Sequence, residues 1–494
     1  MSGRTTINIA GFTVDDNVSL SDDLFNISAG ATLALLSFDA LNDDAVSGSG
    51  RVSIAGPTTL DDRLLLSGAT LFANSSLLAQ NGATVDLGQS SDDAVLARNI
   101  VRSAWTLDNG ARITGAGSSE FVNFGLLDLT DSDSTVDANF YDRGGTIEVD
   151  DGTLDFASPG DVNRFVNDKI EGTGTFEVND LGVLFGSSIS TLDADLEGAR
   201  IIGNVHVSSQ NVYIGDVNLR VGSVLTLTNS AAGVNLVEIV GGGTIILRGD
   251  DSVGAQSSLV GAVTFENYGN TTFTNTNIEF DARSWADDTV TIENETGATW
   301  TDNGGFFSSS HFTSSGAGNA VFVNDGTFIE ETQLGATFDM AVVNNGLMEA
   351  GTPSQLPNIA FQTTSFVLTS VTGTGTIDIG FDPVTVNSVG SGQTLNFDAS
   401  LTGTQTPILD INDIAGFAGT VTGFDQGGVT NDQMVANTAT WQFQDFVANS
   451  GGTGGALMFS NGSAETAINL TGSYDPLGFR SAVSGSTTTI AYAG

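Results

Sequence analysis

Cysteine is absent from the 494 residues, which excludes disulfide bonds, zinc–thiolate sites and thiol catalysis. Proline is rare, at 7 residues, whereas glycine is abundant, at 62. This ratio favours many tight corners over stiff linkers. The sequence also lacks an uninterrupted apolar run of about 18 residues, so we expect no transmembrane helix.

Positive charge is almost missing. Lys169 is the single lysine, and 14 basic residues stand against 58 acidic ones, for a net charge of −44. Between Arg283 and Arg480 there is no Lys or Arg, while the same stretch carries 20 Asp and Glu residues. Nucleic acid and anionic membranes are therefore not expected partners. Cations must screen or bridge this charge, which leaves open either simple solubility in saline water or specific calcium binding.

The N-terminal residues MSGRTTINIAGFTVDDN lack the basic start and apolar stretch of a classical signal peptide. We therefore predict that any export address of this chain lies near its C-terminus.

Short alternating apolar and polar runs recur along the chain, each opened by a corner that contains Gly or Asn. In GGTIEV (144–149), a period of two sends Ile147 and Val149 to one face and Glu148 to the other, as in a half-buried β-strand. The same pattern occurs at 123–129, 174–178, 242–247, 324–329, 344–348 and 373–379.

The spacing of these corners distinguishes two ways of using the strands. Asn123 and Gly144 are 21 residues apart, and Asn324 and Asn344 are 20 apart. Hairpins of a β-sandwich recur about every 8–12 residues, whereas a period near 20 with the same corner chemistry is typical of one solenoid coil. We predict left-handed backbone at these corners, asparagine side chains bonded from coil to coil, and a continuous core of Val, Ile, Leu and Phe.

The predicted fold is therefore all-β. A right-handed parallel β-solenoid (β-helix) with coils of variable length is expected over residues 1–404, and a smaller C-terminal β-domain over residues 405–494.

Three phrases, FVNDGTFI (322–329), VVNNGLME (342–349) and RGGTIEV (143–149), resemble the parallel β-helix regions of bacterial autotransporter passengers and filamentous adhesins. The resemblance extends over roughly residues 20–400. It implies an elongated extracellular or cell-surface protein of a Gram-negative bacterium, with a binding or structural role.

The last 90 residues differ in character. The segments 416–425 (GFAGTVTGFD), 467–474 (AINLTGSY) and 487–492 (TTTIAY) are similar to the C-terminal module of type I secreted, RTX-like repeat proteins. This similarity implies an uncleaved C-terminal export address and a role in secretion or assembly. The glycine–aspartate nonapeptide of calcium-binding RTX repeats is missing from the sequence.

For metal binding, the best local candidate is the carboxylate-dense segment DSDSTVD, with Asp131, Asp133 and Asp137 as calcium ligands. It is not an EF-hand loop, because the position that requires glycine is Val136. The segments 249–251 and 410–413 are weaker candidates. The alternative interpretation of Asp131–Asp137 is a solvated acidic turn.

No catalytic residue and no organic cofactor site is predicted. A polysaccharide lyase needs a basic residue and cations, and inverting hydrolysis needs two carboxylates about 6.5–9.5 Å apart. The aspartate pairs 150–151, 250–251 and 287–288 are expected in turns, because neighbours on a strand point to opposite faces. We expect His206 to face solvent between two valines, and His311 to lie in a serine-rich loop.

The preferred functional hypothesis is a secreted structural protein, not an enzyme, that self-assembles into an extracellular filament, sheath or surface layer. Its main expected partner is another copy of itself, joined end to end or by strand exchange. The alternative is a surface adhesin that binds polysaccharide or a host or abiotic surface, and a polysaccharide-acting enzyme is the third hypothesis.

Overall fold

The computed structural model of the chain is all-β, with strands β1 to β60 and one short 3-10 helix, η1 (Pro476–Gly478). No α-helix occurs among the residues that the structure describes, and thus none that could cross a lipid bilayer. The structure describes residues 6–10, 12–14, 19–21, 23–36, 39–67, 69–89, 98–101, 104–116, 120–157, 163–178, 182–228, 233–236, 238–254, 257–274, 277–282, 289–303, 310–316, 319–331, 335–351, 365–380, 382–398, 406–425, 432–437 and 441–493.

The chain divides into two compact units, Met1–Gly233 (unit 1) and Val234–Gly494 (unit 2). Each unit is built from strands that pair in parallel with the equivalent strand of the next coil. The predicted parallel β-solenoid is therefore confirmed. The predicted boundary at residue 405 stays a prediction.

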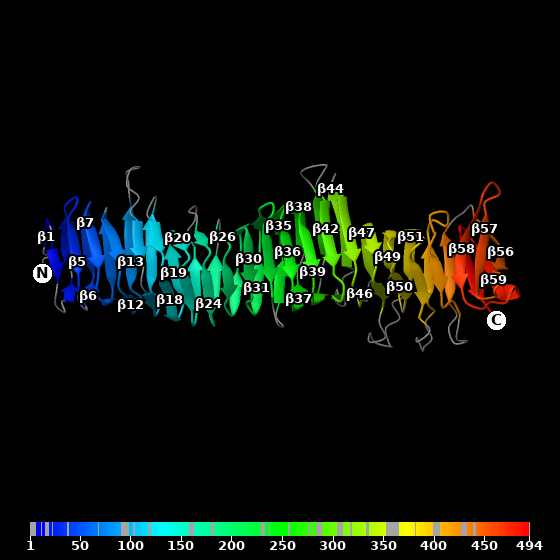
Figure 1. Cartoon of the computed structure of the whole chain (residues 1–494), viewed down its shortest axis with the longest axis horizontal. Coiled ribbons are helices and arrows are strands. Elements are labelled where there is room, and N and C mark those ends of the chain that lie inside the picture. The colour runs from blue at the N-terminus through cyan, green and yellow to red at the C-terminus, as the bar shows by residue number, and fades with distance from the viewer. Residues whose placement is uncertain are drawn as a thin grey trace. The chain divides into compact units, whose positions relative to one another are not determined.

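One coil of unit 1 shows the repeat. It contains β19 (Ser134–Asp137), β20 (Asn139–Arg143) and β21 (Thr146–Val149). These strands pair in parallel with β22 (Thr153–Phe156), β23 (Arg164–Val166) and β24 (Lys169–Gly172) of the next coil. Every third strand therefore stacks in the same sheet (Figure 1).

In unit 2 one sheet stacks β43 (Thr299–Asn303), β46 (Thr327–Glu330), β48 (Leu347–Ala350), β50 (Thr376–Ile379) and β52 (Thr394–Phe397) in parallel. The other sheet contains longer strands, including β45 (Asn319–Asn324), β47 (Ala336–Asn344), β49 (Phe366–Thr372) and β51 (Val384–Val389). The two sheets of the coil enclose the core between them.

Parallel pairing continues through β53 (Ile408–Ile411), β54 (Thr420–Thr422) and β55 (Gln433–Asn437). The last strands then pair antiparallel: β56 (Gln442–Ala448) with β57 (Gly454–Ser460), β57 with β58 (Glu465–Thr471), and β59 (Phe479–Ser484) with β60 (Thr487–Tyr492). Unit 2 thus ends in hairpins instead of coils.

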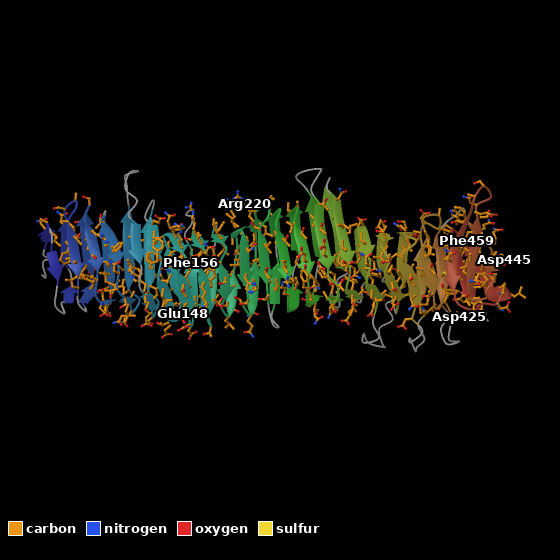
Figure 2. The ribbon with its side chains drawn as sticks, viewed as in Figure 1. Glu148, Phe156, Arg220, Asp425, Asp445 and Phe459 are labelled. Atoms are coloured by element: carbon orange, nitrogen blue, oxygen red, sulfur yellow. The ribbon has the colours of Figure 1, made fainter. Side chains whose placement is uncertain are left out.

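The predicted alternation of inward and outward residues is confirmed. In β21, Ile147 and Val149 are fully buried, whereas Glu148 projects from the outer surface of the ribbon (Figure 2). Each inward residue stacks on the inward residue of the paired strand, as Ile147 does on Ile170. The core is therefore continuous from coil to coil within the unit.

Aromatic side chains form a column inside each unit, as the abundance of phenylalanine suggested. Phe140 and Phe156 lie 4.7 Å apart between ring centroids, and Phe273 stacks on Trp300 at 4.0 Å. Aromatic pairs of this kind contribute about 0.5–1.5 kcal/mol each beyond the burial of their area. The columns contain Trp105, Phe121, Phe140, Phe156, Phe165 and Phe176 in unit 1, and Phe265, Phe273, Trp300, Phe312, Phe322, Phe328, Phe338 and Phe366 in unit 2.

The predicted backbone of the corners is only partly right. Gly144 is left-handed, with a φ of 68°, but Asn123, Asn324 and Asn344 are not among the residues with positive φ. The glycine that follows Asn344 by two positions serves close approach instead: a Cβ on Gly346 would lie 2.0 Å from a backbone oxygen of the coil below. The corner asparagines are selected for their side chains.

Candidate functional site

A ladder of buried amides follows one corner of unit 2. The four asparagines are each the last residue of a strand: Asn267 of β39 (Thr264–Asn267), Asn294 of β42 (Thr289–Asn294), Asn324 of β45 and Asn344 of β47. All four are 0% exposed. Each Nδ2 donates to the Oδ1 of the next, at 2.9, 2.8 and 2.8 Å. The predicted bonding of Asn324 to Asn344 is confirmed.

Each amide of the ladder also uses its second N–H. The Nδ2 of Asn294 donates to the backbone oxygen of Thr327, and that of Asn324 donates to the backbone oxygen of Leu347, both at 2.9 Å. The site therefore requires two donors and one acceptor from each side chain, which an amide provides and an ionised carboxylate does not.

Gln393 provides the side-chain hydrogen-bond acceptor for Asn344 Nδ2, because no asparagine lies in register on the next coil. The coil above Asn344 has Gly373 in register, since Val343 pairs with Thr372. The buried side chain of Gln393, one coil further on, reaches back across this gap. Its Oε1 accepts from Asn344 Nδ2 at 3.1 Å, and its Nε2 donates to the backbone oxygens of Asn344 at 2.6 Å and Thr372 at 2.9 Å.

A different corner, in unit 1, contains carboxylates. It lies between strands of the column of β17 (Glu120–Asn123) and those of the column of β18 (Leu126–Asp131), whereas the amide ladder lies one corner further along the coil, after the column that contains β18 and β39. Asn123 and Asp142 are both 0% exposed, and Asn123 Nδ2 donates to Asp142 Oδ2 at 2.9 Å. The other oxygen, Asp142 Oδ1, accepts from the backbone N–H of Gly145 at 3.1 Å.

Asp168 follows on the next coil and is 2% exposed. Its Oδ1 accepts from the backbone N–H of Gly144 at 2.6 Å, and its Oδ2 has no hydrogen-bond partner among the described residues. Ser187 continues the corner, because its hydroxyl donates to the backbone oxygen of Phe165 at 3.1 Å.

Burial and, to a smaller extent, the neighbouring charge of Asp168 raise the pKa of Asp142 to about 7, against the hydrogen bonds from Asn123 and the backbone. Burial likewise raises the pKa of Asp168 to about 6, against hydrogen bonds from Gly144 and other backbone N–H groups. The two acids therefore exchange protons with solution near neutral pH, which the amide ladder cannot do.

Rows of carboxylates also line the outer faces of the coils. In unit 1, Asp155 of β22, Glu177 of β25 (Thr175–Val178) and Asp195 of β28 (Asp193–Asp195) stand in register on successive strands. Burial, together with the charges of Glu177, Glu197 and Asp155, raises the pKa of Asp195 to about 6, against a hydrogen bond from the backbone N–H of Glu197. The row therefore brings three carboxylates together on successive strands.

The outer row of unit 2 contains two carboxylates and then an amide. Glu349 of β48, Asp378 of β50 and Asn396 of β52 stand in register, and Asn396 Nδ2 donates to Asp378 Oδ1 at 2.9 Å. Burial raises the pKa of Asp378, whereas this hydrogen bond lowers it.

The predicted calcium ligands lie on one turn and its flanking strands. Asp131 ends β18 (Leu126–Asp131) and is exposed, Asp133 is exposed in the turn, and Asp137 ends β19. Asp133 Oδ1 accepts from the backbone N–H of Thr153 at 2.9 Å. Within the described part of the chain, no three His, Cys, Asp or Glu side chains converge in a metal-binding group. Calcium binding here stays a prediction.

The weaker calcium candidates and the aspartate pairs are only partly in turns. Residues 150–151 form a turn after β21, as expected, but residues 250–251 begin β37 (Asp250–Gly254), where Asp250 pairs with Asn270. The pair 287–288 lies outside the described residues. In the segment 410–413, Asp413 Oδ1 accepts from the backbone N–H of Ala415 at 3.1 Å.

The two histidines differ in how well the sequence predicted their positions. His206 is exposed between buried valines, as predicted, and its Nε2 lies 3.0 Å from the hydroxyl of Thr228. His311 lies in β44 (Ser310–Gly316) and pairs with Asn277, so its predicted place in a loop is wrong.

A shallow hollow in unit 1, near Pro57 and Leu77, contains one carboxylate, Asp61. Asp61 Oδ1 accepts from Gln80 Nε2 and from Asn81 Nδ2, the latter at 3.1 Å. This hollow therefore lacks the second carboxylate that inverting hydrolysis requires.

Open strand edges occur at the two chain ends. In the described part of the chain, β1 (Thr6–Ile9), β2 (Phe12–Val14) and β3 (Ser19–Ser21) each pair on one side only, with β4 (Leu24–Ile27), β5 (Thr32–Leu35) and β6 (Asp39–Asn42). β56 and β59 likewise have one partner each, β57 and β60. An unpaired edge presents N–H and C=O groups to a further strand.

Sequence reasoning did not identify Asp142, Asp168 or Gln393. The signal for Asp142 was its position, because it precedes a glycine pair and follows Asn123 by 19 residues, as one corner follows another.

The chain matches no family model, no curated protein and no solved structure.

Proposed function

We propose that the chain is a secreted structural protein that self-assembles into an extracellular filament, sheath or surface layer. The observation that carries this proposal is the pairing of its strands. Stacked coils hold one another by backbone hydrogen bonds, and the first coil and the last hairpins each offer edges that could continue the same stacking.

The surface charge requires that assembly depends on cations. A net charge of −44 opposes association, and rows such as Asp155, Glu177 and Asp195 concentrate that charge on the outer faces. Salt reduces the repulsion over a Debye length of about 8 Å at physiological ionic strength. Calcium is the proposed bridging ion, with Asp131, Asp133 and Asp137 as its proposed ligands.

The resemblances noted above support export from a Gram-negative cell through an uncleaved C-terminal address. The segment from Thr471 onward is part of the fold, since β60 pairs with β55 and the rings of Phe479 and Tyr492 lie 4.9 Å apart. Its deletion is expected to keep the protein inside the cell. Retention must be compared with that of a Tyr492→Ala variant, which disturbs the ring contact but leaves the segment in place.

Negative-stain electron microscopy and sedimentation velocity of the purified protein test the assembly. We expect regular polymers in millimolar calcium and fewer in chelator at low ionic strength, with an intermediate result in sodium chloride alone. The paired substitution Asp131→Asn and Asp133→Asn should weaken the calcium response and leave the sodium response unchanged. A protein that stays monomeric in every condition contradicts self-assembly and favours the adhesin, which sedimentation with polysaccharides would then examine.

A further inference from the structure

Two edge strands close unit 2, and their direction is informative. β58 runs parallel to the coil strand β54, β57 runs antiparallel to β58, and β56 runs antiparallel to β57. β56 therefore runs in the same direction as β54. In the second sheet, β60 runs antiparallel to β55 and β59 antiparallel to β60, so β59 again runs in the coil direction. Both outermost strands thus have the direction that a further coil would need for parallel pairing.

The first coil of unit 1 presents the complementary edges. β1 is the strand of its coil that lies in the sheet of β4, and β2 is the next strand along the chain, in the sheet of β5. The edges in unit 2 have the same order: β56 extends the sheet of β54, and β59 extends the sheet of β55, the next strand after β54. β3 has no such counterpart, since the third column ends in a single bridge between Val389 and Phe417.

Charge is sparse at both of these edges. Residues 1–14 contain one arginine and no acidic residue, and residues 441–493 contain three acidic residues and Arg480. The whole chain has 58 acidic residues in 494, so these two segments carry less negative charge per residue than the chain as a whole, which reduces the repulsion where two ends meet. Exposed apolar side chains lie on the same strands of unit 2: Val447 is 56% exposed on β56, and Val483 is 71% exposed on β59.

The hydrogen-bonding groups of the edges can be assigned from strand alternation. The N–H of Asn449 donates to the oxygen of Gly454, so Ala448, one residue before it, directs its N–H away from β57. The N–H of Ala493 donates to the oxygen of Gly478, so Val483 directs its N–H away from β60. On β1, the backbone oxygen of Ile9 accepts from the N–H of Ser28, which follows β4. The backbone N–H and C=O of Asn8, one residue before Ile9, therefore point to the open side.

From these observations we infer that two copies of the chain join head to tail, with β1 of one copy pairing parallel to β56 of the other and β2 pairing parallel to β59. The inference rests on the proposed function and specifies its contact. The hairpins β56–β57–β58 and β59–β60 reverse the chain twice in each sheet and so restore the direction that the next copy extends.

Asp445 limits this association. Its Oδ1 accepts from the N–H of Phe446 at 2.8 Å, on the open side of β56, and the pairing of β56 with β57 contains an irregularity between Phe443 and Asp445. A carboxylate and a bulge on an edge strand both oppose unwanted pairing. The N–H of Phe446 must exchange this partner for one on the incoming strand.

Complementation between two blocked variants tests the contact. Asn8→Pro removes an open-side N–H from β1, and Val483→Pro combined with Ala448→Pro does so on β59 and β56. Each variant alone is expected to stay monomeric in mass photometry under conditions in which the wild type polymerises. An equimolar mixture should form dimers and nothing larger, because each copy retains one functional end.

Matched controls distinguish the loss of a backbone N–H from the loss of a side chain and from misfolding. Asn8→Ala keeps the N–H but loses the hydrogen bond that Asn8 Oδ1 accepts from Asn26, and Val483→Ala with unchanged Ala448 keeps both N–H groups. These controls should polymerise, with an affinity at least about tenfold higher than that of the proline variants. Circular dichroism of every variant establishes that the coils are retained.

Substitutions of Asp445 should strengthen the association, whereas the proline substitutions should weaken it. Asp445→Ala frees the N–H of Phe446 and should increase the association constant several-fold, whereas Asp445→Asn retains an acceptor and should increase it less. Blocked variants that polymerise like the wild type would overturn the inference while leaving self-assembly intact. Dimers formed by Asn8→Pro alone would likewise overturn it, because they show contact between like ends. A monomeric wild type would instead contradict the proposed function itself.

Discussion

One buried corner of the coil is made from amides in unit 2, whereas another buried corner is made from acids in unit 1. In unit 2, the ladder that includes Asn294, Asn324 and Asn344 satisfies its donors and acceptors with no charge. In unit 1, Asp142 and Asp168 occupy the corner, and burial raises the pKa of each to near neutrality. The backbone of a coil thus accepts either chemistry, but only the acidic corner makes stability depend on pH.

Among the tests of this difference, Asp142→Asn is expected to have the largest effect on stability. A carboxyl whose pKa rises from 3.8 to about 7 on folding binds a proton that the unfolded chain has released between these two pH values. Its contribution is therefore most favourable below about pH 4, declines as the pH rises through this window, and is least favourable above about pH 7. The substitution should stabilise unit 1 by up to about 4 kcal/mol at pH 8 and have little effect at pH 4.

Urea unfolding at pH 4, 6 and 8 measures this dependence. Asn267 shows that one amide oxygen at such a corner can accept two donors, since its Oδ1 accepts from Gly269 at 3.1 Å and from Thr271 at 2.8 Å. Asp131→Asn, at an exposed position, is the matched control and should change stability by less than about 0.5 kcal/mol. An equal gain in the two variants would show that the effect comes from net charge and not from the buried corner.

The reverse substitution, Asn324→Asp, should transfer the acidic behaviour to unit 2. It removes the two N–H donors that bond Asn344 and Leu347, and it places an anion among buried acceptors. We expect a loss of about 3 kcal/mol at pH 7, smaller at pH 5 because the introduced acid can hold its proton. Hydrogen exchange at the amides of Asn345 and Gly346, which donate to the Asn324 carbonyl, measures the local loss. A penalty independent of pH would contradict this explanation.

Much of the fold could be predicted from the sequence because a coil repeats its physical requirements. The 20-residue separation of Asn324 and Asn344 and the alternation around Glu148 each report a local rule, and the structure confirms both. The bonding between asparagines was predictable for the same reason, since identical side chains at identical positions stack on one another.

The parts that were not predictable depend on register between distant residues. Gln393 bonds Asn344 across 49 residues, because a glycine occupies the intervening rung, and no local pattern signals this. The backbone at Asn123 was mispredicted because asparagine has two uses at corners, left-handed backbone and side-chain bonding, and the sequence does not distinguish them. Open edges such as that of β56 follow from pairings that only the whole topology defines.

Gln393→Ala tests whether the end of the amide ladder needs its distant partner. The change removes the buried hydrogen bonds that the Gln393 side chain makes with Asn344 Nδ2 and with the backbone oxygens of Asn344 and Thr372. We therefore expect the free energy of unfolding to fall by about 2 kcal/mol. Gln393→Glu keeps the length but loses both donors, and it should cost at least as much. Unfolding by urea and exchange at the amide of Gly375, which donates to Asn344, provide the measurement. Unchanged stability in both variants would mean that water replaces the side chain.

The smallest expected effect extends the comparison to the outer faces. The row of Asp155, Glu177 and Asp195 in unit 1 has carboxylates at three successive levels, whereas in unit 2 two carboxylates are followed by the amide of Asn396. Glu177→Gln removes the central charge, so the pKa of Asp195 should decrease from about 6, as measured by NMR titration. Its burial remains, and the decrease should therefore be partial.

The same substitution should raise the stability of unit 1 by a few tenths of a kcal/mol in low salt, because like charges on adjacent strands repel. The gain should disappear at about 1 M salt, where the Debye length is about 3 Å. Glu349→Gln in unit 2 is the matched control. It should produce a smaller gain, since the amide of Asn396 already stabilises the charge of Asp378. If the two substitutions gave equal gains that persisted in high salt, the benefit would come from strand propensity, and the amide of Asn396 would have no electrostatic role in the row.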